Sequence, residues 1–162
     1  MKGVIFIMKH LYMMRHGQTL FNVRRRIQGS CDSPLTELGI KQAEAAKELI
    51  KDIAFDHYYS STAERASDTL EIVTEGQVPY TRVKGLEERD FGLFEGESED
   101  LNPHFDDFGY DDLFPHYGGE RKEDVPGLCE VALCVDALYL FGSIGRGTDR
   151  YADCTLHAFD VS

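Results

Sequence analysis

Positive charge is scarce in this chain. Of its 162 residues, 17 are Lys or Arg and 29 are Asp or Glu, which gives a formal net charge of −12 at pH 7. The longest basic run is the triplet Arg24 to Arg26. Because nucleic acids and anionic membrane surfaces attract basic patches, we expect neither as a partner. Any anionic substrate must therefore be held by a few local arginines against a repulsive background.

Long apolar runs and paired cysteines are also lacking. The apolar stretch within residues 1–8 is shorter than a membrane-spanning helix and lacks the layout of a secretory signal peptide. The four cysteines are not paired in spacing near a histidine cluster, which argues against a disulfide framework and a zinc site. His104 and His116 stand among aspartates, but the Asp-x-Asp-x-Asp-Gly pattern of a calcium-binding loop is absent. We therefore expect a cytoplasmic, metal-independent protein without a cofactor.

One apolar stretch ends in groups that suit phosphate chemistry. Leu11 to Met14 predicts a buried strand, and it stops at Arg15, His16 and Gly17. The glycine lets the backbone turn sharply after the strand. Arg forks onto phosphate oxygens, and a neutral imidazole nitrogen can attack phosphorus. The end of this strand is therefore a candidate site for a phosphoryl group.

Strand and helix signals alternate along the first half of the chain. Strands are expected near 11–14, 55–59 and 78–83, and helices near 36–53 and 62–74, the first of them capped by Thr36. This order predicts an α/β fold of three layers, with a mainly parallel sheet covered by helices on both faces. His16, Arg65 and Glu88 then all follow strand ends, where open α/β sheets bind ligands.

Four segments together resemble the histidine phosphatase superfamily, specifically its phosphoglycerate-mutase-like branch. The resemblance covers about residues 9–125 and implies the phosphoglycerate-mutase-like form of the α/β fold. The matching segments are Arg-His-Gly-Gln-Thr at 15–19 with Asn22, Gln28-Gly29 with Asp-x-Pro-Leu-Thr-x-x-Gly at 32–39, Ser-Ser-x-x-x-Arg-Ala-x-x-Thr at 60–69, and Leu-x-Glu-x-x-Phe-Gly at 86–92.

The resemblance assigns roles to residues in these segments. His16 is the expected nucleophile, and Arg15 and Arg65 are expected to hold the phosphoryl oxygens. Arg65 would lie in the first turn of a helix, where the helix dipole also favours an anion. Counting back from Phe91-Gly92 gives Glu88, not Glu87, as the acid that protonates the leaving group. The residues expected to line the substrate pocket are Gln18, Thr19, Asn22, Gln28 and Gly29.

The second half of the chain departs from this pattern. We expect one domain over residues 1–162, in which 95–124 is an acidic and aromatic insertion above the site, with Phe105, Phe108, Tyr110, Phe114 and Tyr117 as its apolar face. Residues 126–162 are atypical, because they lack the Ser-His-Gly motif that carries the family's second catalytic histidine, and His157 does not fit that pattern. A missing strand there would leave the sheet edge beside the first strand bare or differently paired. A second copy of the chain in a homo-oligomer could cover such an edge.

These features favour a phosphate monoester hydrolase that acts on a small-molecule phosphate ester through a phosphohistidine intermediate. A phosphomutase of the phosphoglycerate type would use the same residues, but the acidic segment 95–124 favours hydrolysis. Because the second histidine is missing, the sequence is also compatible with a catalytically impaired phosphate-binding pseudoenzyme and with a poorly folded fragment.

Overall fold

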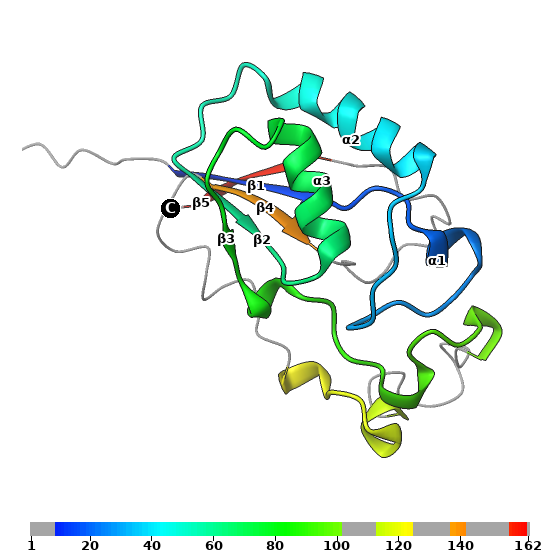
Figure 1. Ribbon diagram of the computed structural model, residues 1–162. Coiled ribbons are helices and arrows are strands. Elements are labelled where there is room, and N and C mark those ends of the chain that lie inside the picture. The colour runs from blue at the N-terminus through cyan, green and yellow to red at the C-terminus, as the bar shows by residue number, and fades with distance from the viewer. Residues whose placement is uncertain (1–8, 102–112, 125–136, 142–155, 162) are drawn as a thin grey trace, which may run out of the picture.

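The computed structural model describes residues 9–101, 113–124, 137–141 and 156–161. Its centre is a five-stranded sheet with the strand order β3-β2-β4-β1-β5 (Figure 1). The strands are β1 (Lys9–Arg15), β2 (His57–Ser60), β3 (Thr81–Arg82), β4 (Ala137–Phe141) and β5 (Leu156–Val161).

Most strands of the sheet run in one direction. β4 lies between β1 and β2 and is parallel to both, and β3 is parallel to β2. β5 is antiparallel to β1 and pairs with it from Lys9 to Met14. The prediction of a mainly parallel sheet is confirmed. The expectation of a bare edge beside β1 is wrong, because the last part of the chain supplies a strand on each side of it.

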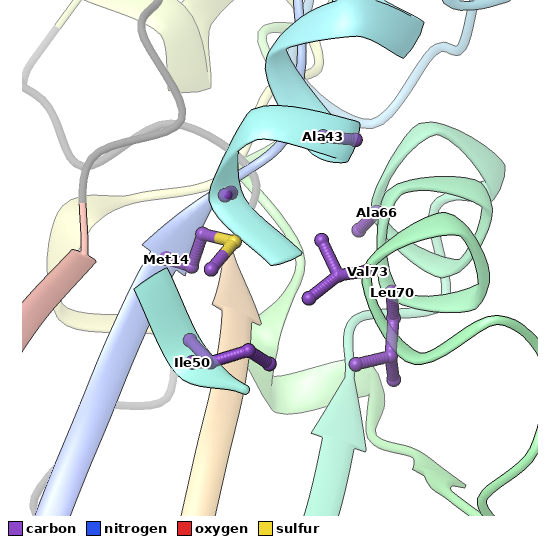
Figure 2. Packing of buried hydrophobic residues seen from close by; sticks show 7 residues of the cluster. Met14, Ala43, Ile50, Ala66, Leu70 and Val73 are labelled. Carbon is purple, nitrogen blue, oxygen red and sulfur yellow. The ribbon is translucent and has the colours of Figure 1, made fainter. Parts of the chain in front are cut away.

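Two helices pack together on one face of the sheet. They are α2 (Glu37–Ile50) and α3 (Glu64–Thr74). Met14 points from β1 toward α2, and Figure 2 shows it in one apolar cluster with Ile50 and the α3 residue Val73. Ala43 and Ala46 of α2 are fully buried in this cluster, because small side chains let the two helices approach closely.

The opposite face of the sheet is also shielded from solvent. Side chains alternate along a strand, so Leu11 and Met13 lie on the face opposite to Met14, and both are buried. Burial on both faces agrees with the layered α/β class. Among the described residues, α2 and α3 cover one face, and no long helix is seen on the other.

Short elements build the rest of the described chain. They are α1 (Leu20–Val23) and five short 3-10 helices, η1 (Lys84–Leu86), η2 (Gly92–Phe94), η3 (Glu99–Leu101), η4 (Phe114–Tyr117) and η5 (Lys122–Asp124). Phe114 is fully buried, and its ring centroid lies 4.7 Å from that of Phe91 and 5.5 Å from that of Phe94. Part of segment 95–124 therefore packs directly against the residues that follow Glu88. Tyr117 is 45% exposed, and Phe105, Phe108 and Tyr110 lie outside the described residues.

Candidate active site

The parallel strands bring their carboxyl ends to one edge of the sheet. Arg15 at the end of β1 is paired with Phe141 of β4, and Ser60 at the end of β2 is paired with Leu140. His16 follows β1 directly, and α3 begins soon after β2. The predicted site residues on these two segments therefore start from the same edge.

His16 is buried and electrically neutral. The residue is 2% exposed, and Nδ1 lies 2.7 Å from the carbonyl oxygen of Gly17. Because a carbonyl oxygen can only accept, Nδ1 carries the proton and Nε2 keeps its lone pair. Burial, followed by the positive charges of Arg65 and Arg15, lowers the pKa of His16 to about 3. The imidazole therefore holds its nucleophilic form at neutral pH.

The turn after His16 is clamped between both helices. Gly17 N donates to the hydroxyl of Thr69, 3.1 Å away, and this hydroxyl donates to the carbonyl oxygen of Arg65 at 2.7 Å. A Cβ at Gly17 would lie 2.4 Å from the carbonyl oxygen of Gly39 in α2. The backbones touch at this point, so the position of His16 depends on two glycines and one buried threonine.

Arg65 is buried and held by a loop far away in sequence. Its residue exposure is 1%, and Nη2 donates to Gly29 O at 2.8 Å. Nη1 donates to Cys31 O at 2.9 Å and to Asp32 Oδ1 at 3.0 Å. A guanidinium has five N–H groups, and these bonds use three of them. Within the described residues Nε makes no hydrogen bond, so Nε–H and one N–H of Nη2 are left for a ligand.

Asp32 has a structural role that the sequence analysis did not assign. Its carboxylate accepts from the backbone N–H groups of Glu64 and Arg65 and also pairs with the Arg65 guanidinium. The residue at the N-cap of α3 is Ala63, which has no side-chain acceptor. Asp32 therefore caps the helix from another loop and fixes the same arginine by two routes.

Glu88 is a buried carboxyl group with a raised pKa. Burial raises the pKa of Glu88 to about 7, although the Arg89 N–H and the charges of Arg65 and Arg15 act to lower it. Oε1 accepts from Arg89 N at 3.3 Å, while the buried Oε2 has no partner among the described residues. The guanidinium groups of Arg65 and Arg15 thus act on both His16 and Glu88. The four residues that carry the predicted chemistry lie in one electrostatic environment.

Arg89 supports the segment that carries Glu88. Arg89 is buried, and its guanidinium carbon lies 4.8 Å from the ring centroid of Phe114 and 5.6 Å from that of Phe91. Stacking on two rings suits a planar guanidinium. No local pattern in the sequence indicates this role of Arg89, because its stacking on Phe114 joins segments that are distant in sequence.

The residues expected to line the substrate pocket are bound to one another and to neighbouring loops. Thr19 and Asn22 form a capping box at the start of α1, and the Thr19 hydroxyl lies 2.6 Å from Gln28 Oε1. Gln18 Oε1 accepts from the hydroxyl of Thr36 at 2.8 Å. Gly29 is packed so tightly that a Cβ would lie 2.2 Å from the carbonyl oxygen of Arg89. The structure thus shows these residues held in place by contacts within the protein.

Cys31 lies on the loop that holds Arg65, but it is a poor nucleophile. Burial, followed by the carboxylate of Glu95, raises the pKa of its thiol to about 12. The reactive form of a cysteine is the thiolate, so this group is inert at neutral pH. His16 is therefore the better candidate nucleophile of the two.

Two further kinds of feature are absent from the described parts of the chain. Within them, no group of three or more His, Cys, Asp or Glu side chains is arranged to hold a metal ion. None of the helices seen there has the length and apolar character to cross a membrane.

β4, the parallel neighbour of β1, is not directly followed by a second histidine. β4 ends at Phe141, and the sequence continues with Gly142, Ser143 and Ile144. The sequence contains no histidine between His116 and His157. The family's second catalytic histidine therefore has no counterpart at the end of this strand.

The sequence matches the family model of the histidine phosphatase superfamily (branch 1) over residues 11–130. The match covers most of the chain, and the chain belongs to this superfamily. A relative from Proteus mirabilis (strain HI4320), named "Probable phosphoglycerate mutase GpmB", is 39% identical over 89 residues, which are 54% of this chain and 41% of the relative. The chain thus spans about two fifths of the length of that relative.

Solved structures share the fold. A phosphoglycerate mutase from Bacillus anthracis str. Sterne superposes with a TM-score of 0.71 at 23% identity, over 94% of this chain and 88% of that one. A mycobacterial glucosyl-3-phosphoglycerate phosphatase, solved in complexes with VO3, has a TM-score of 0.68 at 28% identity, over 83% of this chain and 75% of that one. The phosphoglycerate-mutase-like form of the α/β fold is therefore confirmed.

Proposed function

We propose that the chain is a phosphate monoester hydrolase that works through a phosphohistidine on His16. The observation that carries the proposal is a buried, neutral imidazole whose unprotonated Nε2 belongs to the same electrostatic environment as Arg15 and Arg65. A nucleophile of this kind needs no base to activate it, and positive charge beside it favours a phosphoryl group over a neutral substrate.

The first step transfers the phosphoryl group to the protein. Nε2 of His16 forms a bond to phosphorus while the bond between phosphorus and the ester oxygen breaks. Glu88 gives its proton to the leaving oxygen, so an alcohol departs and a carboxylate remains. The raised pKa of Glu88, about 7, keeps a large fraction of this group protonated at neutral pH.

The second step restores the protein. The Glu88 carboxylate takes a proton from a water molecule as the water oxygen attacks phosphorus. The bond between phosphorus and Nε2 breaks, inorganic phosphate leaves, and His16 is neutral again. One water is consumed in each cycle, and each group returns to its starting protonation state.

Arg15 and Arg65 hold the non-bridging oxygens in this proposal. The Nε–H and the remaining Nη2–H of Arg65 suit two oxygens of one phosphoryl group, because Arg binds phosphate through paired donors. The arginines supply the positive charge, so the mechanism requires no metal. We propose that Gln18, Thr19, Asn22, Gln28 and Gly29 line the substrate pocket as the residues that shape the loops around these arginines.

The missing second histidine is expected to slow the reaction. It would have contributed one donor to the transferring phosphoryl group, and loss of one such donor costs on the order of 10²–10³ in rate. We therefore propose that this chain is a weak hydrolase.

A phosphomutase is the second candidate, since relatives of this chain are named as phosphoglycerate mutases. A mutase returns the phosphoryl group to a second hydroxyl of the bound substrate instead of passing it to water. Activity that depends on a bisphosphate primer would identify the mutase, whereas release of inorganic phosphate without a primer would identify the hydrolase.

The expected setting of the protein is also a proposal. The substrate would be a small-molecule phosphate ester in the cytoplasm, with neither nucleic acid nor membrane as partner, because the chain carries a net charge of −12.

The test is hydrolysis of p-nitrophenyl phosphate and of a panel of alkyl phosphates, with inorganic phosphate as the product measured. We expect slow turnover that is lost in the His16→Ala variant. Saturable phosphate binding without any turnover in the wild type would contradict the proposal and identify a pseudoenzyme. A cooperative thermal melt of the wild type must accompany either result, to exclude an unfolded fragment.

A further inference from the structure

The carboxylate of Glu95 accepts four backbone hydrogen bonds. Oε2 accepts from the N–H groups of Gly29 and Cys31, both at 3.1 Å. Oε1 accepts from Ser30 at 3.0 Å and from Phe91 at 2.8 Å. Hydrogen bonds to an ionised acceptor are roughly twice as strong as neutral ones. One side chain thus fixes the backbone of a loop that lies more than sixty residues earlier in the sequence.

The same loop holds Arg65 through its carbonyl groups. Gly29 and Cys31 give their N–H groups to Glu95 and their carbonyl oxygens to Nη2 and Nη1 of Arg65. The loop therefore lies between a carboxylate and a guanidinium, and the peptide group between Gly29 and Ser30 bridges them: its N–H, on Ser30, donates to Glu95, and its carbonyl oxygen, on Gly29, accepts from Arg65. Bonds arranged in such a chain polarise and strengthen one another.

Glu95 also belongs to the segment that carries Glu88. Its Oε1 accepts from Phe91, three residues after the predicted proton donor. Ile27 is joined to the same segment by two backbone bonds, from Gly96 N to Ile27 O at 2.9 Å and from Ile27 N to Glu97 O at 2.8 Å. Glu95 is therefore placed where the arginine-holding loop meets the segment of the proton donor.

We propose that Glu95 is a positioning residue for phosphoryl transfer: it holds the loop of residues 29–31 so that Arg65 and Glu88 face the same phosphoryl group. This inference rests on the proposed function of the site. Glu95 itself need not touch the substrate, because its effect passes through the loop to the guanidinium of Arg65.

The first variant is Glu95→Gln. An amide has one acceptor oxygen in place of two, and its NH2 group would face N–H donors that it cannot satisfy. The loop should then shift, and misplacement of catalytic groups by about 1 Å can cost about 100-fold. We expect kcat/KM for p-nitrophenyl phosphate to fall by roughly 10- to 100-fold.

Glu120→Gln is the matched control. Glu120 Oε2 also accepts a backbone N–H in the Glu88 segment, from Asp90 at 2.9 Å, but no described contact links Glu120 to the loop of residues 29–31. The Glu120→Gln change removes the same charge as Glu95→Gln and alters one bond of the same type. We therefore expect it to change kcat/KM by less than about threefold.

A double-mutant cycle with Arg65→Lys separates a positioning role from a general structural one. Since Glu95 acts through Arg65, the Glu95→Gln change should cost less than about threefold in the Arg65→Lys background. Independent effects would multiply in full, and that result would overturn the inference. So would equal effects of Glu95→Gln and Glu120→Gln. Should Glu95→Gln fail to melt cooperatively, Glu95→Asp replaces it in the cycle, with the same expected loss of additivity.

Binding of orthovanadate, measured by titration without turnover, keeps the two proposals apart. If the wild type binds orthovanadate but does not hydrolyse the ester, the proposed hydrolase function is refuted. The double-mutant cycle is then calculated from the dissociation constants of orthovanadate. If the wild type turns over and the two changes remain additive, the role of Glu95 fails alone. A wild type that neither binds orthovanadate nor hydrolyses the ester overturns both.

Discussion

Nδ1 of His16 donates a hydrogen bond to the carbonyl oxygen of Gly17 across 2.7 Å. This contact selects one tautomer of a buried ring and leaves Nε2 as the unprotonated nitrogen. The proposed chemistry depends on that choice, because the other tautomer would present an N–H to the substrate. A glycine carbonyl, rather than a carboxylate, orients this candidate nucleophile.

The pH dependence of the rate should follow Glu88. Protonated Glu88 donates in the first step, and its pKa is about 7, while His16 stays neutral down to about pH 3. For an alkyl phosphate, kcat/KM corrected for substrate ionisation should be flat on the acid side and fall about tenfold per pH unit above 7. Glu88→Gln should remove this alkaline limb, whereas Glu87→Gln should retain it because Glu88 is still present. A rate that rises between pH 6 and pH 8 would contradict the assignment.

Glu88 should also make the fold less stable as pH rises. Its pKa is 4.5 in the unfolded chain and about 7 in the folded one, so between these values the folded state binds more protons. The free energy of unfolding then decreases through this window, by about 3 kcal/mol in total. Glu88→Gln stays neutral at every pH and is expected to exceed the wild type in stability at pH 8. Urea unfolding at pH 4 and pH 8 measures this, and an equal difference at both pH values would refute it.

Gly39 should be intolerant of a side chain. A Cβ there would lie 2.1 Å from the carbonyl oxygen of Gln18, which is backbone and cannot rotate away. Gly39→Ala should cost about 1–3 kcal/mol from overpacking, more than the roughly 1 kcal/mol gained in helix propensity. It should also lower kcat, because Gln18 lies two residues after His16. Gly76 has φ of +63° and open space around it, so Gly76→Ala should cost about 1 kcal/mol and leave kcat unchanged.

Asp32→Asn should destabilise the fold more than a comparable surface change. Asp32 pairs at 3.0 Å with Arg65, whose side chain is 0% exposed, and it also caps α3. We expect a loss of about 1–3 kcal/mol in the free energy of unfolding. The control is Asp100→Asn, which breaks a 2.7 Å pair with the exposed Arg25 and should stay within about 0.5 kcal/mol. Equal losses of unfolding free energy in the two variants, measured with urea, would show that the buried pair stabilises the fold no more than the exposed pair.

The sequence predicted the first half of the fold well, because its patterns are local. The helix expected over 36–53 is Glu37–Ile50, capped by Thr36 as expected, and the helix expected over 62–74 is Glu64–Thr74. The strand expected over 78–83 shrinks to Thr81–Arg82 at the sheet edge. β4 and β5 were missed, because the tail has no family motif and a strand becomes recognisable there only through its pairing with β1.

The candidate site likewise contains residues that local sequence patterns predict and residues that such patterns miss. His16, Arg65 and Glu88 could be selected because each stands in a short motif next to a strand or helix end. Asp32 and Glu95 could not be assigned roles, because the contacts that join them to Arg65 and to the loop of residues 29–31 span more than thirty residues of sequence. Their carboxylates meet backbone N–H groups, and no side-chain pattern in the sequence records such contacts.

Phosphoryl transfer to His16 tests the central claim most directly. The protein is mixed with a phosphate ester, quenched in base, where phosphohistidine is stable, and digested for mass spectrometry. We expect a phosphoryl group on Nε2 in the peptide that contains His16, its loss in His16→Ala, and its retention in the control His57→Ala, which changes an exposed histidine of β2. Labelling that persists in His16→Ala, or that falls on another peptide, would contradict it.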